Sequence, residues 1–336
     1  MKYVATAVAA GTGGSHTLQE ERLQRLFGPT VLSFFEENFK QMYFRGHEGV
    51  KLRAVCQQKQ EGSTVLLILG GRTEFAEKYA EVIHDLRMLD MGIYTFDHRG
   101  QGLSQRLLED HEKGHVGRFD DYVEDVRIFL EEYIGKGRRV FVLAHSMGGA
   151  IALRFQQKYP NLLEALILSS PMLGINCLPL TQKFTRMLSR RAVLDGRGHD
   201  YIIGGHPYRQ MRFIRNVLTS SRVRFDINQE FCRRNPAFSL GSPTNSWLYE
   251  SLSACAAIAK EAESVTVPVL LLQSGSDRVV MAPDQKRFSL RAPACRLHTF
   301  AGARHELLME RDSLRDQALQ RIREFFEEQG VAVSPA

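Results

Sequence analysis

Ser146 is the residue of this 336-residue chain whose surroundings most favour nucleophilic chemistry. It follows an apolar run at residues 140–143 and precedes a helix-forming stretch at 151–157. A tight turn between a strand and a helix strains the serine backbone and lifts Oγ above the sheet, and the N–H groups at the helix start are free to hold an oxyanion. Gly148 and Gly149 suit such a turn, whereas Ala144 stands where the GxSxG pattern has its first glycine. The segment therefore predicts an activated serine, and its alternative is a plain strand–turn–helix.

Two further residues follow apolar runs in an order that suits a catalytic triad. Asp277 comes just after the run at 267–272, and His305 ends a glycine-containing loop after the run at 295–300. Considered singly, the aspartate is typical of a turn or a helix N-terminus, and the histidine is typical of an exposed loop. Taken together, each after its own strand and in the chain order Ser, Asp, His, they predict the triad of an α/β-hydrolase.

The elements that position these residues alternate along the chain. Strands are predicted at 41–45 and 50–57, which form a hairpin, and at 64–69, 92–96, 140–143, 165–168, 267–272 and 295–300. Apolar residues recur at helical spacing over 75–89, 119–133 and 313–327. This rhythm predicts right-handed βαβ units, and hence the α/β class with a mainly parallel, doubly wound sheet covered on both faces.

The alternation stops at residues 172–260, which contain 13 basic and 5 acidic residues. The rest of the chain has 31 basic and 33 acidic residues, so this segment carries the whole positive excess. We predict an N-terminal extension at 1–34, a hydrolase core at 35–171 and 261–336, and a helical cap at 172–260, inserted after the strand that follows the nucleophile helix. A basic cap suits an anionic membrane surface or a phosphate head group, and its alternative is a solvated arginine-rich face. Nucleic acid is not expected, because the arginines come without a binding module.

The composition indicates the cellular compartment of the protein, and the predicted chemistry indicates whether it needs a cofactor. The five cysteines are odd in number, scattered and without CxxC spacing, so they are expected to be reduced thiols in a cytoplasmic protein rather than bridges or metal ligands. The apolar run at residues 3–10 is too short for a convincing export signal, and no stretch approaches the length of a membrane span. Serine catalysis by a triad requires no metal and no organic cofactor.

An oxyanion hole needs two N–H groups aimed at one point. One is expected from Met147, directly after the nucleophile, and the other from the backbone of Arg72 in the loop after the first long strand. The alternative for the Gly70–Gly71 pair is a simple turn. Gly71, His145 and, in the cap, Trp247 are expected to line the substrate.

Four segments resemble the serine hydrolases related to monoacylglycerol lipase: DHRGQGLS (97–104), GHVGRFDDY (114–122), AHSMGGA (144–150) and SPMLGI (170–175). GRTE (71–74), the alanine before His145, NVLTSSR (216–222), GSPT (241–244) and Trp247 are more similar to the PldB-type bacterial lysophospholipases. The similarity extends from about Phe35 onward. It implies hydrolysis of the single fatty ester of a lysophospholipid, with acyl transfer to another lipid as a companion reaction, at the inner face of a membrane.

Other functions share these residues. A monoacylglycerol lipase or general carboxylesterase would use the same triad, and a proline iminopeptidase would add an acidic anchor for the substrate amine, of which the cap offers few. A hydrolase-fold receptor without activity would normally lack a triad member. The segment Asp97-His98-Arg99 is expected to form a structural network beneath the site rather than to join the catalytic set.

Overall fold

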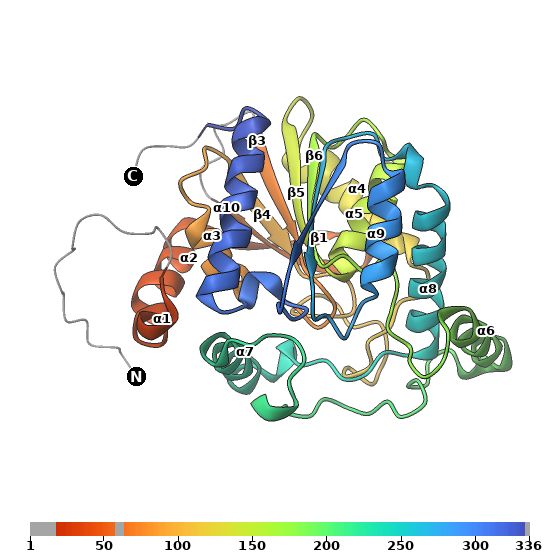
Figure 1. Cartoon of the computed structure of the whole chain (residues 1–336). Coiled ribbons are helices and arrows are strands. Elements are labelled where there is room, and N and C mark those ends of the chain that lie inside the picture. The colour runs from red at the N-terminus through yellow and green to blue at the C-terminus, as the bar shows by residue number, and fades with distance from the viewer. Residues whose placement is uncertain (1–17, 58–63, 333–336) are drawn as a thin grey trace.

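The computed structural model describes residues 18–57 and 64–332 and contains one eight-stranded sheet with helices on both faces (Figure 1). The strand order is β1-β2-β4-β3-β5-β6-β7-β8. β2 is antiparallel to both β1 and β4, and all other neighbours are parallel. The predicted α/β class and mainly parallel sheet are therefore confirmed. The apolar run at residues 3–10 lies outside the described residues.

The strands at the centre of the sheet form where continuous apolar runs allow burial on both sheet faces. The predicted hairpin is β1 (Phe39–Arg45) paired with β2 (Lys51–Gln57). The central strands are β3 (Thr64–Leu69), β4 (Gly92–Phe96), β5 (Arg139–His145) and β6 (Ala165–Ser169), followed by β7 (Val269–Ser274) and β8 (Cys295–Phe300). β7 begins two residues later than the predicted strand, after Pro268, which has no N–H for a strand ladder.

Two hydrophobic cores lie on opposite faces of the sheet. One is formed with α4 (Asp120–Phe129), α5 (Met147–Lys158), α8 (Asn245–Lys260) and α9 (Ala282–Arg291). The other is formed with α2 (Ser33–Asn38), α3 (Ala80–Asp85) and α10 (Asp312–Glu328). None of the helices in the described ranges is long and apolar enough to cross a membrane.

The helix predicted over 75–89 is shorter than its periodicity suggested. Phe75 is extended, residues Ala76–Tyr79 form a 3-10 turn, and α3 ends at Asp85. The Asp97 carboxylate, at the end of β4, accepts the N–H of Ala76 at 2.8 Å and so fixes where the turn begins. A loop contact from a distant strand therefore overrides the local helical pattern.

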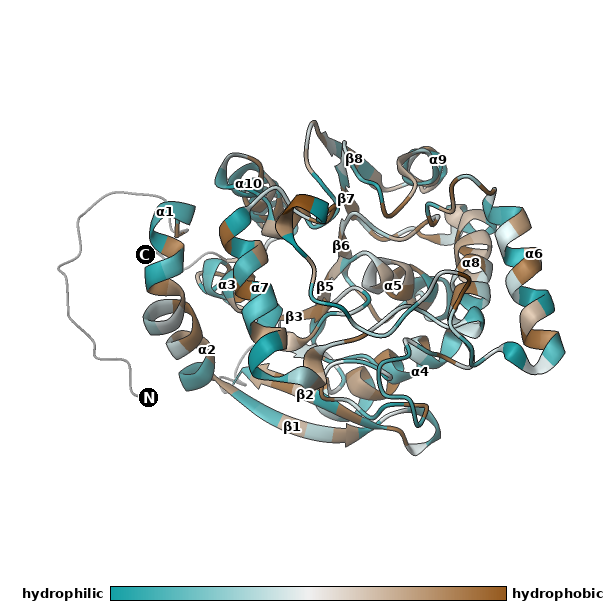
Figure 2. Cartoon of the chain, turned by 90° about the horizontal axis from the view of Figure 1, so that it is seen from below, coloured by the Kyte–Doolittle hydropathy of each residue, from teal (hydrophilic) through white to brown (hydrophobic). Residues whose placement is uncertain are grey.

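Between β6 and β7, residues 172–260 contain helices and loops and no strand. α6 (Gln182–Ala192), α7 (Arg222–Arg234) and the first turns of α8 lie beyond one end of the sheet (Figure 1). Seen from that side, α6 and α7 face the viewer, and α6 shows alternating polar and apolar bands (Figure 2). The N-terminal helix α1 (Glu20–Leu26) joins cap to core, because Glu20 accepts from Ser221 and donates its N–H to Asp312 at 2.7 Å.

Candidate active site

The turn between β5 and α5 holds Ser146 in a strained backbone conformation, with φ 51° and ψ −115°. This region is rarely adopted by residues other than glycine. The close approach of α5 to β3 requires Gly148, since a Cβ there would lie 2.2 Å from the carbonyl oxygen of Leu69. Gly149 is equally constrained by Pro171, at 2.7 Å from a Cβ. The turn thus has the expected strand–turn–helix geometry, and Ala144 is accommodated within β5.

The three predicted triad residues meet at the carboxyl ends of their strands. His305 Nε2 lies 2.9 Å from Ser146 Oγ, and His305 Nδ1 lies 2.7 Å from Asp277 Oδ2. The second carboxylate oxygen of Asp277 accepts the N–H groups of Val279 and Val280 at 2.7 and 3.0 Å. Burial alone would raise the pKa of Asp277, but the hydrogen bond and charge of His305, together with these amides, lower it below its ordinary value. The carboxylate is thus ionised and aligned with the imidazole.

Two backbone N–H groups next to the serine are left without a protein acceptor in the described ranges, those of Arg72 and Met147. The neighbours of Arg72 are engaged: Glu74 accepts the N–H of Gly71, and the side chain of Gln101 accepts that of Thr73 at 3.3 Å. The loop is thereby fixed while one amide stays available. Both predicted oxyanion donors therefore have the freedom that the role requires.

A buried ionic cluster supports this loop, which sequence reasoning missed. Lys78 Nζ lies 2.8 Å from Glu74 Oε1 and 2.6 Å from Glu306 Oε1, and the Tyr79 hydroxyl donates to Glu74 at 2.6 Å. Burial would raise the pKa of Glu74, but the charges of Lys78 and His145 and the hydrogen bonds from Lys78 and Tyr79 hold it well below its usual range. Lys78 thus ties this loop, residues 70–74, which we call the oxyanion loop after its predicted role, to Glu306, the residue that follows His305.

The serine opens into a cavity of about 420 Å³ between core and cap. The predicted substrate-lining residues Gly71, His145 and Trp247 all border it, as do Arg72 and Met147. His145 Nδ1 donates to the carbonyl of Ser169 at 3.0 Å, which fixes its ring beside His305. The remaining lining is largely apolar and comes mainly from the cap and from the strand ends: Met172, Ile175, Met211, Leu218, Phe238, Leu240, Val279 and Val280.

The segment Asp97-His98-Arg99 lies beneath the oxyanion loop and not among the triad. His98 Nε2 donates to the carbonyl of Gly70 at 3.1 Å, and Arg99 forms a two-point ion pair with Asp125 at 2.7 Å. Burial lowers the pKa of His98 to about 4, so its ring is neutral. These residues hold the loops that carry the site.

The remaining contributions to the cavity were not found from sequence. His206, Tyr208 and Arg209 come from an irregular part of the cap, which has no periodic pattern to reveal its direction. Glu74 offered the clearest available signal, since an acidic residue three positions after the Gly-Gly pair is well placed to accept loop amides.

The sheet order, the serine turn and the hydrogen-bonded Ser–His–Asp arrangement define a serine hydrolase of the α/β-hydrolase class. The sequence pattern of the family described as "Serine aminopeptidase, S33" matches residues 60–312, and the chain belongs to that family. It is 38% identical over 299 residues to lysophospholipase L2 of Escherichia coli K12, covering 84% of this chain and 86% of that protein.

Two further comparisons agree with this assignment. The chain is 30% identical over 300 residues to the probable lysophospholipase L2 of Haemophilus influenzae, covering 88% of this chain and 94% of that protein. Among solved structures, a soluble variant of the monoglyceride lipase from Saccharomyces cerevisiae superposes with a TM-score of 0.68 at 18% identity. That match covers 87% of this chain and 96% of that one, and it shows the shared fold.

Proposed function

We propose that the protein hydrolyses the fatty ester of lysophospholipids through an acyl-enzyme on Ser146. The observation that carries this proposal is the continuous hydrogen-bonded path from Ser146 Oγ through His305 to Asp277, at 2.9 and 2.7 Å, below a largely apolar cavity. The two relatives named lysophospholipase L2 supply the substrate class.

In the first half-reaction, His305 Nε2 takes the Ser146 proton as Oγ attacks the ester carbonyl carbon. Asp277 stabilises the imidazolium, and the N–H groups of Arg72 and Met147 hold the oxyanion. His305 then gives the proton to the leaving glycerol oxygen. Water, activated by the same histidine, cleaves the acyl-enzyme and releases the fatty acid; a lipid hydroxyl in place of water would give acyl transfer.

The cavity suits an acyl chain better than the amine of a peptide. An aminopeptidase needs a free carboxylate to anchor the substrate ammonium, and the acids lining the described cavity are Glu74 and Glu306. Both are already engaged by the ammonium of Lys78, at 2.8 and 2.6 Å, so neither is free to anchor a substrate. The apolar cap side chains bury methylene groups at about 0.8 kcal/mol each.

Labelling with a fluorophosphonate probe tests the nucleophile. The wild type should be labelled, Ser146→Ala should not, and circular dichroism should show that the variant is folded. Ser170→Ala is the matched control: Ser170 follows the neighbouring strand β6, is buried and has a φ of 45°, but its Oγ lies 2.8 Å from Ser274 Oγ rather than from a histidine. Continued labelling of Ser146→Ala would overturn the assignment.

The substrate class is tested on three esters with one acyl chain: a lysophosphatidylcholine, a monoacylglycerol and a nitrophenyl ester. Under the proposal, kcat/KM is highest for the lysophospholipid. A preference for the monoacylglycerol would move the protein to the alternative, monoacylglycerol lipase. Equal rates on all three esters would instead indicate a general carboxylesterase.

We also propose that the cap contacts an anionic membrane surface from the cytoplasmic side. Its arginines and lysines divide into paired and unpaired groups. Arg222 pairs with Asp226, and Arg233 and Arg234 pair with Glu230. In the described structure no ion pair involves the following cap residues: Lys183, Arg186, Arg190, Arg209 and Arg212.

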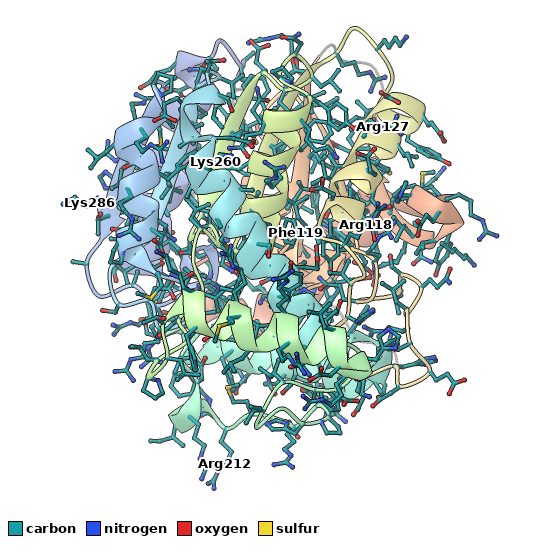
Figure 3. The ribbon with its side chains drawn as sticks, turned by 90° about the vertical axis from the view of Figure 1, so that its right-hand side faces the viewer. Arg118, Phe119, Arg127, Arg212, Lys260 and Lys286 are labelled. Atoms are coloured by element: carbon teal, nitrogen blue, oxygen red, sulfur yellow. The ribbon has the colours of Figure 1, made fainter. Side chains whose placement is uncertain are left out.

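Exposed apolar side chains accompany these cations. Ile203 is 96% exposed, Ile214 87% and Leu194 69%. Arg212, two residues before Ile214, extends away from the body of the molecule at the cap end (Figure 3). Cationic and apolar side chains on one surface are what an anionic bilayer binds. The five free thiols suit the reducing side of such a membrane.

Vesicle sedimentation tests this surface. Binding should be stronger to vesicles with phosphatidylglycerol than to phosphatidylcholine alone, and it should weaken as salt is raised. Ile214→Asp should reduce binding, whereas Leu290→Asp, at a site 77% exposed on core helix α9, should not. Binding that is insensitive to salt and to Ile214→Asp would refute the membrane contact and leave the esterase proposal standing.

A further inference from the structure

The charged side chains around the catalytic cavity do not balance. The two acids, Glu74 and Glu306, share the single ammonium of Lys78, so this cluster alone has one negative charge in excess. Arg72 and Arg209 also line the cavity, and neither forms an ion pair with any carboxylate in the described ranges. Lys78, Arg72 and Arg209 together outnumber the two carboxylates by one, and the two arginines are the cations without an anionic partner.

Arg72 is held in place by contacts that leave its charge uncompensated. Its guanidinium lies 5.3 Å from the ring centroid of Trp247 and donates through Nη2 to the carbonyl of Gly241. Gly114 also lies against the guanidinium, since a Cβ there would come within 2.5 Å of Nη2. Nε is shielded from solvent without an acceptor, and no protein acceptor in the described ranges contacts Nη1 either. The contacts of the Arg72 guanidinium are thus with neutral groups alone, although a buried cation is normally paired with an anion. The guanidinium is therefore able to bind an anionic group of the substrate.

Arg72 remains a cation in this setting. Burial lowers the pKa of Arg72 to about 10, which leaves the guanidinium charged at neutral pH. A planar guanidinium forms its strongest hydrogen bonds with carboxylate or phosphate oxygens.

The position of the cation relative to the ester site favours a phosphate. The backbone N–H of Arg72 is the proposed oxyanion donor, so the same residue marks the ester carbonyl and carries the charge. As many bonds separate the Arg72 backbone nitrogen from Cζ as separate the ester carbonyl carbon from phosphorus in a 1-acyl lysophospholipid. An ester carbonyl at the oxyanion hole therefore has its phosphodiester within the span of this side chain.

We propose that the Arg72 guanidinium is a specificity-determining group that binds the phosphodiester of a lysophospholipid whose ester faces Ser146. This inference rests on the proposed function and deepens it. The anion replaces the missing counter-charge, whereas a monoacylglycerol of the same chain length leaves the cation unpaired.

The test compares two short-chain substrates below their micellar concentrations, so that membrane adsorption does not contribute: a hexanoyl lysophosphatidylcholine and monohexanoylglycerol. In Arg72→Met, loss of packing against Trp247 lowers both rates. Loss of the charge should lower kcat/KM for the phospholipid by a further factor of roughly 10 to 100, as a charge-assisted hydrogen bond provides. The readout is the ratio of the two kcat/KM values. Arg72→Lys, which keeps the charge without the planar fork, should give an intermediate ratio and covers the case in which Arg72→Met does not fold.

Arg215→Met is the matched control, because it removes an exposed cap arginine that lies outside this cavity and has no ion pair in the described structure. Its ratio should equal that of the wild type. An equal fall of both substrates in Arg72→Met would show that Arg72 only fastens the cap, and would overturn the inference. If the wild type cleaves neither substrate, the proposed function itself is wrong. A changed ratio of the two kcat/KM values in Arg215→Met would show that selectivity depends on the overall charge of the cap, and would overturn the assignment to Arg72.

Discussion

Replacing Lys78 by methionine should expose how strongly the oxyanion loop depends on one buried cation. Lys78 is 8% exposed, and its ammonium contacts Glu74 and Glu306 at 2.8 and 2.6 Å. Both oxygens lie within reach of a single nitrogen, so they are separated by no more than about 5.4 Å. At an effective dielectric constant of about 20, two carboxylates at that distance repel by roughly 3 kcal/mol.

Loss of the two attractions adds to this repulsion. We expect Lys78→Met to lower the free energy of unfolding at pH 7 by about 3–5 kcal/mol, the range found when one partner of a buried ion pair is removed. The measurement is urea-induced unfolding followed by circular dichroism. kcat/KM should fall as well, because Glu74 accepts the N–H of Gly71 in the oxyanion loop and Glu306 is adjacent to His305.

The pH dependence gives the prediction its sharpest form. In the wild type the pKa of Glu74 is held below its usual range, so the stability it contributes is present above the unfolded-state pKa and is lost as the pH falls. In Lys78→Met, by contrast, protonation of one carboxylate relieves the repulsion. The two stability curves should therefore converge between pH 7 and pH 5.

Lys158→Met is the control for this experiment. Lys158 also bridges two acids, Asp120 at 3.2 Å and Glu124 at 2.9 Å, but its side chain is 31% exposed. Its loss should cost no more than about 1 kcal/mol. A deficit in Lys78→Met as small as that of the control, or one that does not change with pH, would show that the cluster is screened and that this reasoning is wrong.

Three further outcomes follow from the geometry. Asp277→Asn should reduce kcat roughly 10⁴-fold with little change in thermal stability, because an amide favours the wrong imidazole tautomer; a loss below tenfold in steady-state kinetics would contradict the role of Asp277. The folded-state pKa of His98, lowered to about 4, lies below the unfolded value near 6.5, so the free energy of unfolding decreases by up to about 3 kcal/mol as the pH falls between them. His98→Gln should flatten that part of the curve of unfolding free energy against pH, and an unchanged slope would contradict the buried neutral His98. Gly148→Ala should cost about 3 kcal/mol in urea unfolding, since its Cβ would lie 2.2 Å from a backbone oxygen, whereas Gly28→Ala, with nothing within 4 Å, should stay within about 1 kcal/mol of the wild type; equal effects would refute the steric argument.

The sheet could be predicted because its signal is local. The central parallel strands are buried on both faces, so they appear as continuous apolar runs, and β3 begins and ends where its run does. β8, a partly exposed strand at the edge of the sheet, also has its predicted bounds. The predicted extent of the helix over 75–89 was wrong because the deciding signal there is not local. Its periodicity is real, but the turn at Ala76 is set by Asp97, a residue on another strand.

The same distinction applies to the site. Ser146, Asp277 and His305 were predicted to meet because each follows a strand, and parallel strands bring their carboxyl ends to one edge. The cluster of Glu74, Lys78 and Glu306 was missed because Lys78 does not follow a strand end and lies 228 positions from Glu306, so no local pattern joins the two residues. A buried ion pair between a helical turn and a distant loop is a property of the folded chain alone.

The charge that the cap presents cannot be determined from a count of its basic and acidic residues. The excess of basic residues at 172–260 predicted a cationic cap, yet Arg224 is buried and donates to Glu81 and Asp312 at 2.8 Å. Both acids lie outside the cap, so this arginine fastens the cap to the core and presents no charge to a lipid. Conversely, Arg72 belongs to the core sequence, but it packs against Trp247 of the cap and brings an uncompensated cation to the cavity. The charge that a substrate meets is therefore decided by which arginines lack a carboxylate partner, and folding, rather than composition, makes that selection.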